Sequence, residues 1–523
     1  MTTLRPWQVS WHARPRSAGN IVSGGLWVNK LPASDPERMR RSNPAGLSEH
    51  AAEFVYFHAM TALHDMTAGE LLAAYKSKSL SPVEAVDAVI ARIEAWEPKL
   101  KALYAPDFEG ARKAATASEA RWQRGAPQGP LDGVPITIKE NIATKGVPVP
   151  LGTAATELVP AANDAPAAAR VREAGAIILS KTTMPDYGML SSGRSSFHPL
   201  TRNPWNLAWN PGGSSAGAGA AAAAGYGPLH LGTDIGGSVR LPASWNGIFT
   251  LKPSLGRVPV DPPFFGRAIG PMTRSVADSC LLMAELSKPD WRDHMNLPPA
   301  DIDWAAGPLE PKGLRIGLHM DAGCGMPVEP ETKAAIEAVA KLFAAAGAHV
   351  EPVAPFMTPA MLDLQDVFWR VRSWVDFSAL SHARQAKVLP FIADWCRAGA
   401  DVSGPMVIRG VNNYMAIRAA TVKATQPFDY VLSPTSPVPT FPAEWEMPSN
   451  DVNRAMDHIG FTVPYNMSEQ PAASINCAYT KEGKPIGLQI SGRRFDDSGV
   501  MRLSRWFESA RGEQKKWPDP PTS

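Results

Sequence analysis

Residues 210–242 read NPGGSSAGAGAAAAAGYGPLHLGTDIGGSVRLP, and the rest of the chain is best interpreted from this stretch. It holds two glycine-flanked serines, Ser214 and Ser238, separated by an alanine-rich run and a short apolar segment. Alanine is the strongest helix former and Gly225 suits a helix C-terminus, so residues 216–224 predict a small helix that begins just after Ser214. A helix with such small side chains can pack closely against its neighbours.

The apolar segment that follows, residues 229–231, predicts a short buried strand closed by the turn-forming residues 232–234. Ser238 is therefore expected on a turn. Because glycine has no Cβ, successive backbone N–H groups in this turn could point toward one site and stabilise an oxyanion: those of Ile235, Gly236, Gly237 and Ser238. An isolated Gly-Gly-Ser is more often a flexible loop, so the prediction needs a second feature.

The second feature lies upstream, in residues 133–141, which read GVPITIKEN. The apolar, β-branched run predicts a strand that delivers Lys139 at its end. Desolvation beside buried residues would disfavour the ammonium and lower the lysine pKa toward the working range of a base. The alternative is that Lys139 pairs with Glu140 or another carboxylate on a solvated edge. This peptide alone favours the solvated pair.

Together these segments resemble the amidase signature family of hydrolases. The family pattern is a strand-borne KD, then GGSSGG, then GTDxGGSxR. This sequence has Lys139-Glu140, GGSSAG at residues 212–217 and GTDIGGSVR at residues 232–240. The two serines lie 24 positions apart, as in the family.

The resemblance implies a catalytic triad of Lys139, Ser214 and Ser238. Ser238 would be the nucleophile that accepts the acyl group, and Ser214 would bridge it to Lys139 from an unusual cis peptide bond after Gly213. Ser214 would take the proton of Ser238 and pass its own to the neutral lysine, and the direction would reverse to protonate the leaving amine.

The resemblance also implies supporting roles for Ser215, which would help the nucleophile by hydrogen bonding, and for Asp234 with Arg240, which would brace the turn. Three positions depart from the family pattern. Ala216 replaces a glycine, which would cause strain if that position had a positive φ. Glu140 replaces an aspartate. Glu469 stands where glycine is usual, with its carboxylate expected either near the substrate or in solvent.

Composition excludes several classes of function. The 523 residues carry a formal net charge of only +2, so no electrostatic footprint for nucleic acid or an anionic membrane is present. We expect a small-molecule amide as the partner, with a homodimer as one expectation for the assembly. The four cysteines, Cys280, Cys324, Cys396 and Cys477, have no metal-ligand spacing. We therefore expect no metal, no cofactor and a cytoplasmic location.

The chain is expected to form one amidase domain over residues 60–523, a single α/β/α domain around a twisted mixed β-sheet, preceded by a poorly ordered extension, residues 1–59. Thr67 with Glu70 and Ser81 with Glu84 match capping boxes and predict two helices near its start. The signature core covers about residues 131–278. Residues 355–425 match the family poorly and are rich in aromatic side chains, so we expect them to shape the substrate pocket.

The sequence thus predicts an amidase that cleaves the C–N bond of a carboxamide through an acyl-serine intermediate. Two alternatives remain: a glutaminase like the A subunit of glutamyl-tRNA amidotransferase, which needs partner subunits, and a non-catalytic amidase-like binding protein. A Ser-His-Asp hydrolase is disfavoured because Arg240 occupies the final glycine of G-x-S-x-G.

Overall fold

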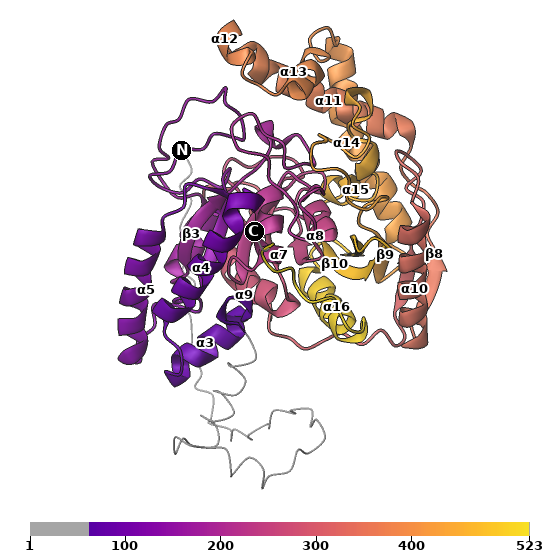
Figure 1. The fold of residues 1–523 in the computed structure, drawn as a ribbon. Coiled ribbons are helices and arrows are strands. Elements are labelled where there is room, and N and C mark those ends of the chain that lie inside the picture. The colour runs from indigo at the N-terminus through magenta and orange to yellow at the C-terminus, as the bar shows by residue number, and fades with distance from the viewer. Residues whose placement is uncertain (1–61, 522–523) are drawn as a thin grey trace, which may run out of the picture. The chain divides into compact units, whose positions relative to one another are not determined.

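The computed structural model describes residues 62–521, which form a single mixed β-sheet with surrounding helices (Figure 1). The predicted α/β class and mixed sheet are confirmed. The expectation of a poorly ordered extension over residues 1–59 lies outside the described residues.

The sheet has eleven strands in the order β1-β3-β2-β4-β6-β5-β10-β11-β9-β7-β8. Parallel pairs join β2 to β3 and β4, and join β7 to β8 and β9, whereas the other neighbours are antiparallel. The strands are β1 Leu103–Tyr104, β2 Pro135–Lys139, β3 Ile177–Thr182, β4 Leu229–Asp234, β5 Phe249–Lys252, β6 Ala268–Thr273, β7 Arg315–Leu318, β8 His349–Pro352, β9 Tyr430–Pro434, β10 Ala472–Tyr479 and β11 Pro485–Gly492.

Helices cover the sheet, and Figure 1 shows α11 to α14 gathered at the top of the view, above the strands. The α-helices are α3 Ala68–Ser77, α4 Pro82–Leu100, α5 Phe108–Gln123, α6 Pro166–Glu173, α7 Ala216–Ala224, α8 Arg240–Asn246, α9 Val276–Leu286, α10 Pro330–Ala345, α11 Pro359–Ser378, α12 His382–Gln385, α13 Pro390–Arg397, α14 Gly404–Thr425, α15 Val463–Met467 and α16 Asp497–Ala510. Short 3₁₀ turns lie at Leu63–Asp65, Asp186–Gly188, Val452–Arg454 and Asp457–Ile459.

The two predicted capping boxes are present and begin α3 and α4. The Thr67 side chain accepts from the backbone of Glu70, and that glutamate reaches back to Thr67. Ser81 and Glu84 make the same reciprocal pair at the start of α4. These local interactions satisfy N–H groups that the first helical turn leaves without partners.

Helix α7 is buried on every side, which its alanines and glycines make possible. A Cβ on Gly217 would lie 2.3 Å from the carbonyl oxygen of Ala102, and one on Gly219 would lie 2.8 Å from the Asn246 amide nitrogen. Any larger residue at these positions would push the helix away from its neighbours. The small side chains therefore let α7 pack closely against Ala102 and Asn246.

The adjacent parallel strands β2 and β4 bring the site residues together. Ile138 pairs with Leu231, so both strands end at the same edge of the sheet, β2 at Lys139 and β4 at Asp234. Strand β4 is longer than predicted: residues 232–234, expected as a turn, continue the strand through antiparallel pairing with β6. That pairing partner lies more than 30 residues further along the chain, beyond the reach of a local pattern.

None of the helices within residues 62–521 combines the length and the apolar character needed to cross a membrane.

Candidate active site

The amine of Lys139 lies at the end of β2 and has no exposed surface. Its Nζ donates to three hydroxyl oxygens: Ser214 Oγ at 2.8 Å, Ser215 Oγ at 3.0 Å and Thr233 Oγ1 at 2.9 Å. Glu140 turns elsewhere, accepting from the Gly152 N–H and contacting His198 Nε2. Lys139 is therefore buried among hydroxyls, and the alternative of a solvated pair with Glu140 is wrong.

This environment lowers the pKa of Lys139 to about 7. Burial is the largest cause, because a low-dielectric site disfavours the ammonium. The charges of Asp234 and Glu140 oppose the shift, and that of Arg267 adds to it. A large share of the protein therefore carries a neutral lysine near pH 7, with a lone pair able to accept a proton from a neighbouring hydroxyl.

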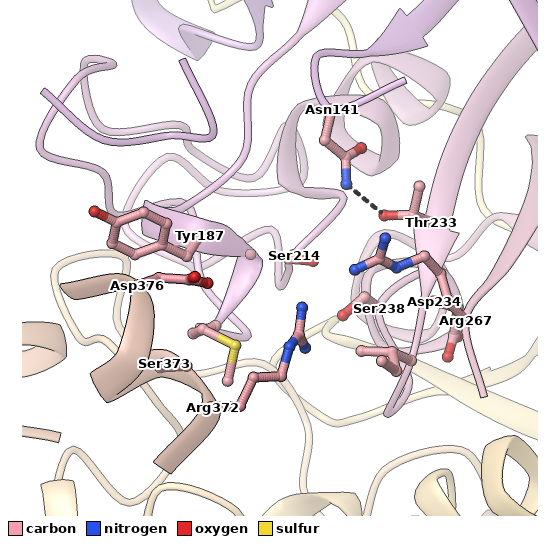
Figure 2. Close-up of a pocket in the computed structure, with 13 residues that line it drawn as sticks. Asn141, Tyr187, Ser214, Thr233, Asp234, Ser238, Arg267, Arg372, Ser373 and Asp376 are labelled. Atoms are coloured by element: carbon pink, nitrogen blue, oxygen red, sulfur yellow. Dashed lines mark hydrogen bonds between the residues drawn. The ribbon is translucent and has the colours of Figure 1, made fainter. Parts of the chain in front are cut away.

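Ser214 and Ser238 line one pocket, which Figure 2 shows from close by. The peptide bond between Gly213 and Ser214 is cis, as the resemblance implied. Ser238 lies on the predicted turn, between β4 and α8. The Ser215 N–H donates to the Ser238 carbonyl at 3.2 Å, which ties the start of α7 to this turn. The Ser215 hydroxyl contacts Lys139 and the backbone of Thr233, so Ser215 contacts Ser238 through its backbone N–H and Lys139 through its side chain.

Asp234 shapes the turn that carries Ser238. Its carboxylate accepts from the Gly237 N–H at 2.8 Å and from the Val239 N–H at 3.2 Å. The Gly237 N–H is therefore already hydrogen-bonded to Asp234. It is not free to stabilise an oxyanion, although the sequence had predicted that role. The N–H groups of Ile235, Gly236 and Ser238 remain as candidate donors.

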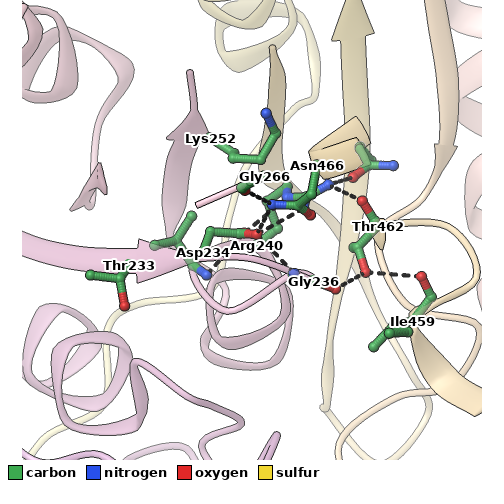
Figure 3. A network of polar contacts seen from close by, with 12 residues as sticks. Thr233, Asp234, Gly236, Arg240, Lys252, Gly266, Ile459, Thr462 and Asn466 are labelled. Carbon is green, nitrogen blue, oxygen red and sulfur yellow. Dashed lines mark hydrogen bonds and ion pairs between the residues drawn. The ribbon is translucent and has the colours of Figure 1, made fainter. Parts of the chain in front are cut away.

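Arg240 connects the turn to the C-terminal part of the chain, as Figure 3 shows. Its guanidinium donates to both oxygens of Asp234, at 3.1 and 3.0 Å, to the Thr462 carbonyl at 2.9 Å and to Asn466 Oδ1 at 2.6 Å. Burial alone would raise the pKa of Asp234, but the Arg240 charge and hydrogen bonds hold it well below its usual range. Thr462 also donates to the Gly236 carbonyl at 2.6 Å. Hydrogen bonds made by Asp234, Arg240 and Thr462 thus hold the turn in place.

The three departures from the family pattern leave the site intact. Ala216 begins α7 and does not have a positive φ, so no strain arises there. Glu140 is buried between Gly152 and His198. Glu469 has a φ of 64° and is buried in ion pairs with Arg418 and Arg494. Both expected placements of Glu469 are wrong, since its carboxylate neither lines the pocket nor lies free in solvent.

Several pocket residues were not predicted individually. Thr233 was assigned to a turn, although its hydroxyl contacts Lys139 and accepts from Asn141 Nδ2 at 3.1 Å. Helix α11, inside the variable region 355–425, contributes three pocket residues whose position only the tertiary fold reveals: Arg372, Ser373 and Asp376. Tyr187 reaches the same pocket from the 3₁₀ turn Asp186–Gly188, and Arg267 reaches it from the loop before β6.

A family model described as Amidase matches residues 84–501, and this chain belongs to that family. Among relatives, the chain is 32% identical over 485 residues to the A subunit of the glutamyl-tRNA(Gln) amidotransferase from Myxococcus xanthus, covering 85% of this chain and 97% of the relative. It is 31% identical over 467 residues to an acylamidase from Rhodococcus erythropolis, covering 87% and 98%.

Solved structures agree with this assignment. A bacterial aryl acylamidase of the amidase signature enzymes has a TM-score of 0.80 at 30% identity, covering 86% of this chain and 97% of that chain. A 6-aminohexanoate cyclic dimer hydrolase complexed with substrate has a TM-score of 0.78 at 27% identity, covering 88% and 99%. The resemblance found in the sequence is confirmed at the level of family and fold.

Proposed function

We propose that this protein is an amidase that hydrolyses a carboxamide to a carboxylic acid plus ammonia or an amine through an acyl-Ser238 intermediate. The observation that carries the proposal is the buried Lys139 amine, 2.8 Å from the Ser214 hydroxyl, at a pocket that Ser214 shares with Ser238. The acylamidase relatives support the same reaction class. The four unpaired cysteines support a cytoplasmic enzyme.

The acylation step follows from this arrangement. Ser238 Oγ forms a bond to the amide carbon while its proton passes to Ser214, whose own proton passes to the neutral Lys139. The carbonyl oxygen becomes an oxyanion that accepts from backbone N–H groups of the turn. When the C–N bond breaks, the proton returns from Lys139 through Ser214 to the leaving nitrogen. Water then attacks the acyl ester, and the same relay moves its proton to Ser238.

The test is turnover of purified protein on a panel of aliphatic, aromatic and amino-acid amides. We expect Ser238→Ala to abolish turnover and Lys139→Ala to lower kcat/KM by about 10³-fold, the scale of a lost acid–base group. Ser378→Ala and Lys387→Ala, which change exposed side chains, serve as matched controls and keep the wild-type rate. Wild-type rates in Ser238→Ala or Lys139→Ala would overturn the proposal.

A second candidate is a glutaminase that works with partner subunits, favoured by the similarity to the amidotransferase relative from Myxococcus xanthus. The two candidates differ in what the isolated chain can do. Turnover of simple amides by the chain alone supports the amidase. Hydrolysis of glutamine that begins only when amidotransferase partner subunits are added supports the second candidate.

A further inference from the structure

Two arginines face the nucleophile. Arg267 comes from the loop before β6, and Arg372 comes from α11. Figure 2 shows both guanidinium groups directed into the space beside Ser238. Among the residues that the structure describes, neither arginine forms an ion pair with Asp or Glu.

Both guanidinium groups lie against the same aromatic ring, that of Phe264. The guanidinium carbon of Arg372 lies 4.2 Å from the centre of the Phe264 ring, and that of Arg267 lies 5.6 Å from it. Burial lowers the pKa of Arg267 to about 10, and the charge of Arg372 adds to the shift. Arg267 therefore stays protonated at neutral pH. Two like charges at a partly buried site repel each other unless an anion lies between them.

The acidic residues at this pocket do not supply that anion. The Asp234 carboxylate is already held by Arg240, Asn466 and two backbone N–H groups. Asp376 lines the pocket from α11, but in the described part of the chain no ion pair joins it to Arg267 or Arg372. The space next to Ser238 is thus left with an excess of positive charge.

Ser238 also borders an apolar compartment on another side. A Cβ on Gly236 would lie only 3.0 Å from the Trp369 ring, so the indole packs directly against the turn. Further apolar side chains line this compartment: Leu241, Met447, Met456 and Ile459. Arg372 lines both compartments and stands at the boundary between them.

We propose that the substrate is an amide with a carboxylate at one end, held by Arg267 and Arg372, and an apolar group at the other, held against Trp369. This inference rests on the proposed function and names the substrate class of the same site. Guanidinium groups bind carboxylates through paired, charge-assisted hydrogen bonds, which fix orientation as well as affinity. The carboxylate stays unchanged while the C–N bond is hydrolysed, so its role is to position the scissile carbonyl over Ser238.

Two matched pairs of substrates test the proposal. N-Hexanoylglycine carries its carboxylate on the amine side, with N-propylhexanamide as the neutral counterpart. Succinic acid monoanilide carries it on the acyl side, with butyranilide as the counterpart. We expect the acidic member of at least one pair to have a kcat/KM about 100-fold higher than its counterpart, the scale of a lost charged hydrogen-bonding partner. The pair that shows the preference identifies whether the substrate carries its carboxylate on the amine side or the acyl side of the amide bond.

Variants connect that preference to the arginines. In Arg372→Leu the ratio of kcat/KM between acidic and neutral members should fall about 30-fold or more. Arg372→Lys keeps the positive charge but loses the planar, paired N–H donors of the guanidinium. It should therefore retain part of the preference in kcat/KM for the acidic substrate. Arg409→Leu removes an exposed guanidinium from the neighbouring helix α14 and should keep the full ratio. Equal or better turnover of both neutral members by the wild type overturns the inference while leaving the amidase proposal standing.

Binding gives a readout that does not need turnover. Calorimetry with the Ser238→Ala protein should show binding of N-hexanoylglycine or succinic acid monoanilide, weakened about 30-fold or more by adding Arg372→Leu. If wild-type protein hydrolyses no amide, the proposed function fails and binding alone decides the inference. Binding that does not depend on Arg372 then overturns it as well.

Discussion

At the scale of single residues, the chemistry depends on how Lys139 is solvated. Water would stabilise its ammonium, but among the described residues the buried amine has only the hydroxyls of Ser214, Ser215 and Thr233 within hydrogen-bonding distance. Three neutral oxygens replace hydration incompletely, so the pKa falls to about 7. Under the proposed function, the same amine is a base before acylation and an acid when the leaving group departs.

The pH dependence of kcat/KM should report this group. In the proposed mechanism Lys139 acts in its neutral form, so kcat/KM should rise with pH, reach half its maximum near pH 7 and level off above it. The measurement is kcat/KM for a neutral amide from pH 5 to 9, with Ser378→Ala as a control that keeps the profile. A profile that is flat through pH 7, or that falls, contradicts a lysine base.

Replacement of Thr233 should shift the pH dependence of kcat/KM. Its hydroxyl accepts from the Lys139 amine and so favours the charged form, which means that Thr233→Val should move the rising limb to lower pH. Loss of this contact should also cost about 10-fold in kcat through poorer positioning of the amine. Thr233→Ser keeps the hydroxyl and is expected to restore the wild-type profile. An unchanged profile in the valine variant would show that this contact has no influence on the base.

At the scale of elements, the site is a strand end, a helix start and a turn held in one arrangement. Helix α7 and strand β4 could be predicted from the sequence because alanine content, flanking glycines and apolar runs act locally. The continuation of β4 to Asp234 could not, since it depends on pairing with the distant β6. Likewise, Arg372 and Asp376 enter the pocket only because α11 folds over it.

The occupied N–H of Gly237 illustrates the same limit within the turn. Glycines predicted that backbone groups could turn inward, but the sequence did not indicate that the Asp234 carboxylate would take one of them. Lys139, Ser214 and Ser238 were predicted as a set because the family resemblance linked three segments that no local pattern connects. The contact of Lys139 with Thr233, and that of Asn141 with the same Thr233 hydroxyl, emerged only from the fold.

The turn should lose its support when Arg240 is replaced. Arg240→Met leaves the Asp234 charge buried without its partner, which should lower the free energy of unfolding by about 3–5 kcal/mol. Arg397→Met is the matched control, because it breaks the exposed pair with Asp394 and should cost less than about 1 kcal/mol. Urea denaturation monitored by circular dichroism measures both. Equal stability of the two variants would show that Arg240 does not brace the turn.

At the scale of the whole molecule, Lys139 is one of three lysines that are buried within residues 62–521. Lys181 and Lys252 also lie among carbonyl and hydroxyl oxygens, and burial lowers the pKa of each to about 7. The fold therefore holds three amines that ionise far more readily once it unfolds. This links the stability of the domain to pH.

The three buried lysines should make stability rise with pH just above neutrality. Between about pH 7 and 8.5 the unfolded chain keeps protons on these lysines that the folded protein has lost, so their contribution to the free energy of unfolding increases with pH. Each lysine contributes up to about 1.4 kcal/mol per pH unit. Urea denaturation at pH 7.5, 8.0 and 8.5 should show a smaller slope for Lys252→Met than for the wild type. Because both proteins share all other titrating groups, identical slopes would contradict a neutral buried Lys252.

The proposed mechanism depends most on Ser238 forming a covalent bond to the acyl group, with Lys139 as the base. The direct measurement is mass spectrometry of protein quenched during turnover of an activated amide, with peptide mapping of the modified residue. We predict the mass of the acyl group on Ser238 in the wild type, none in Ser238→Ala and far slower formation in Lys139→Ala. An acyl group on another residue, or turnover in Ser238→Ala at the wild-type rate, would contradict it.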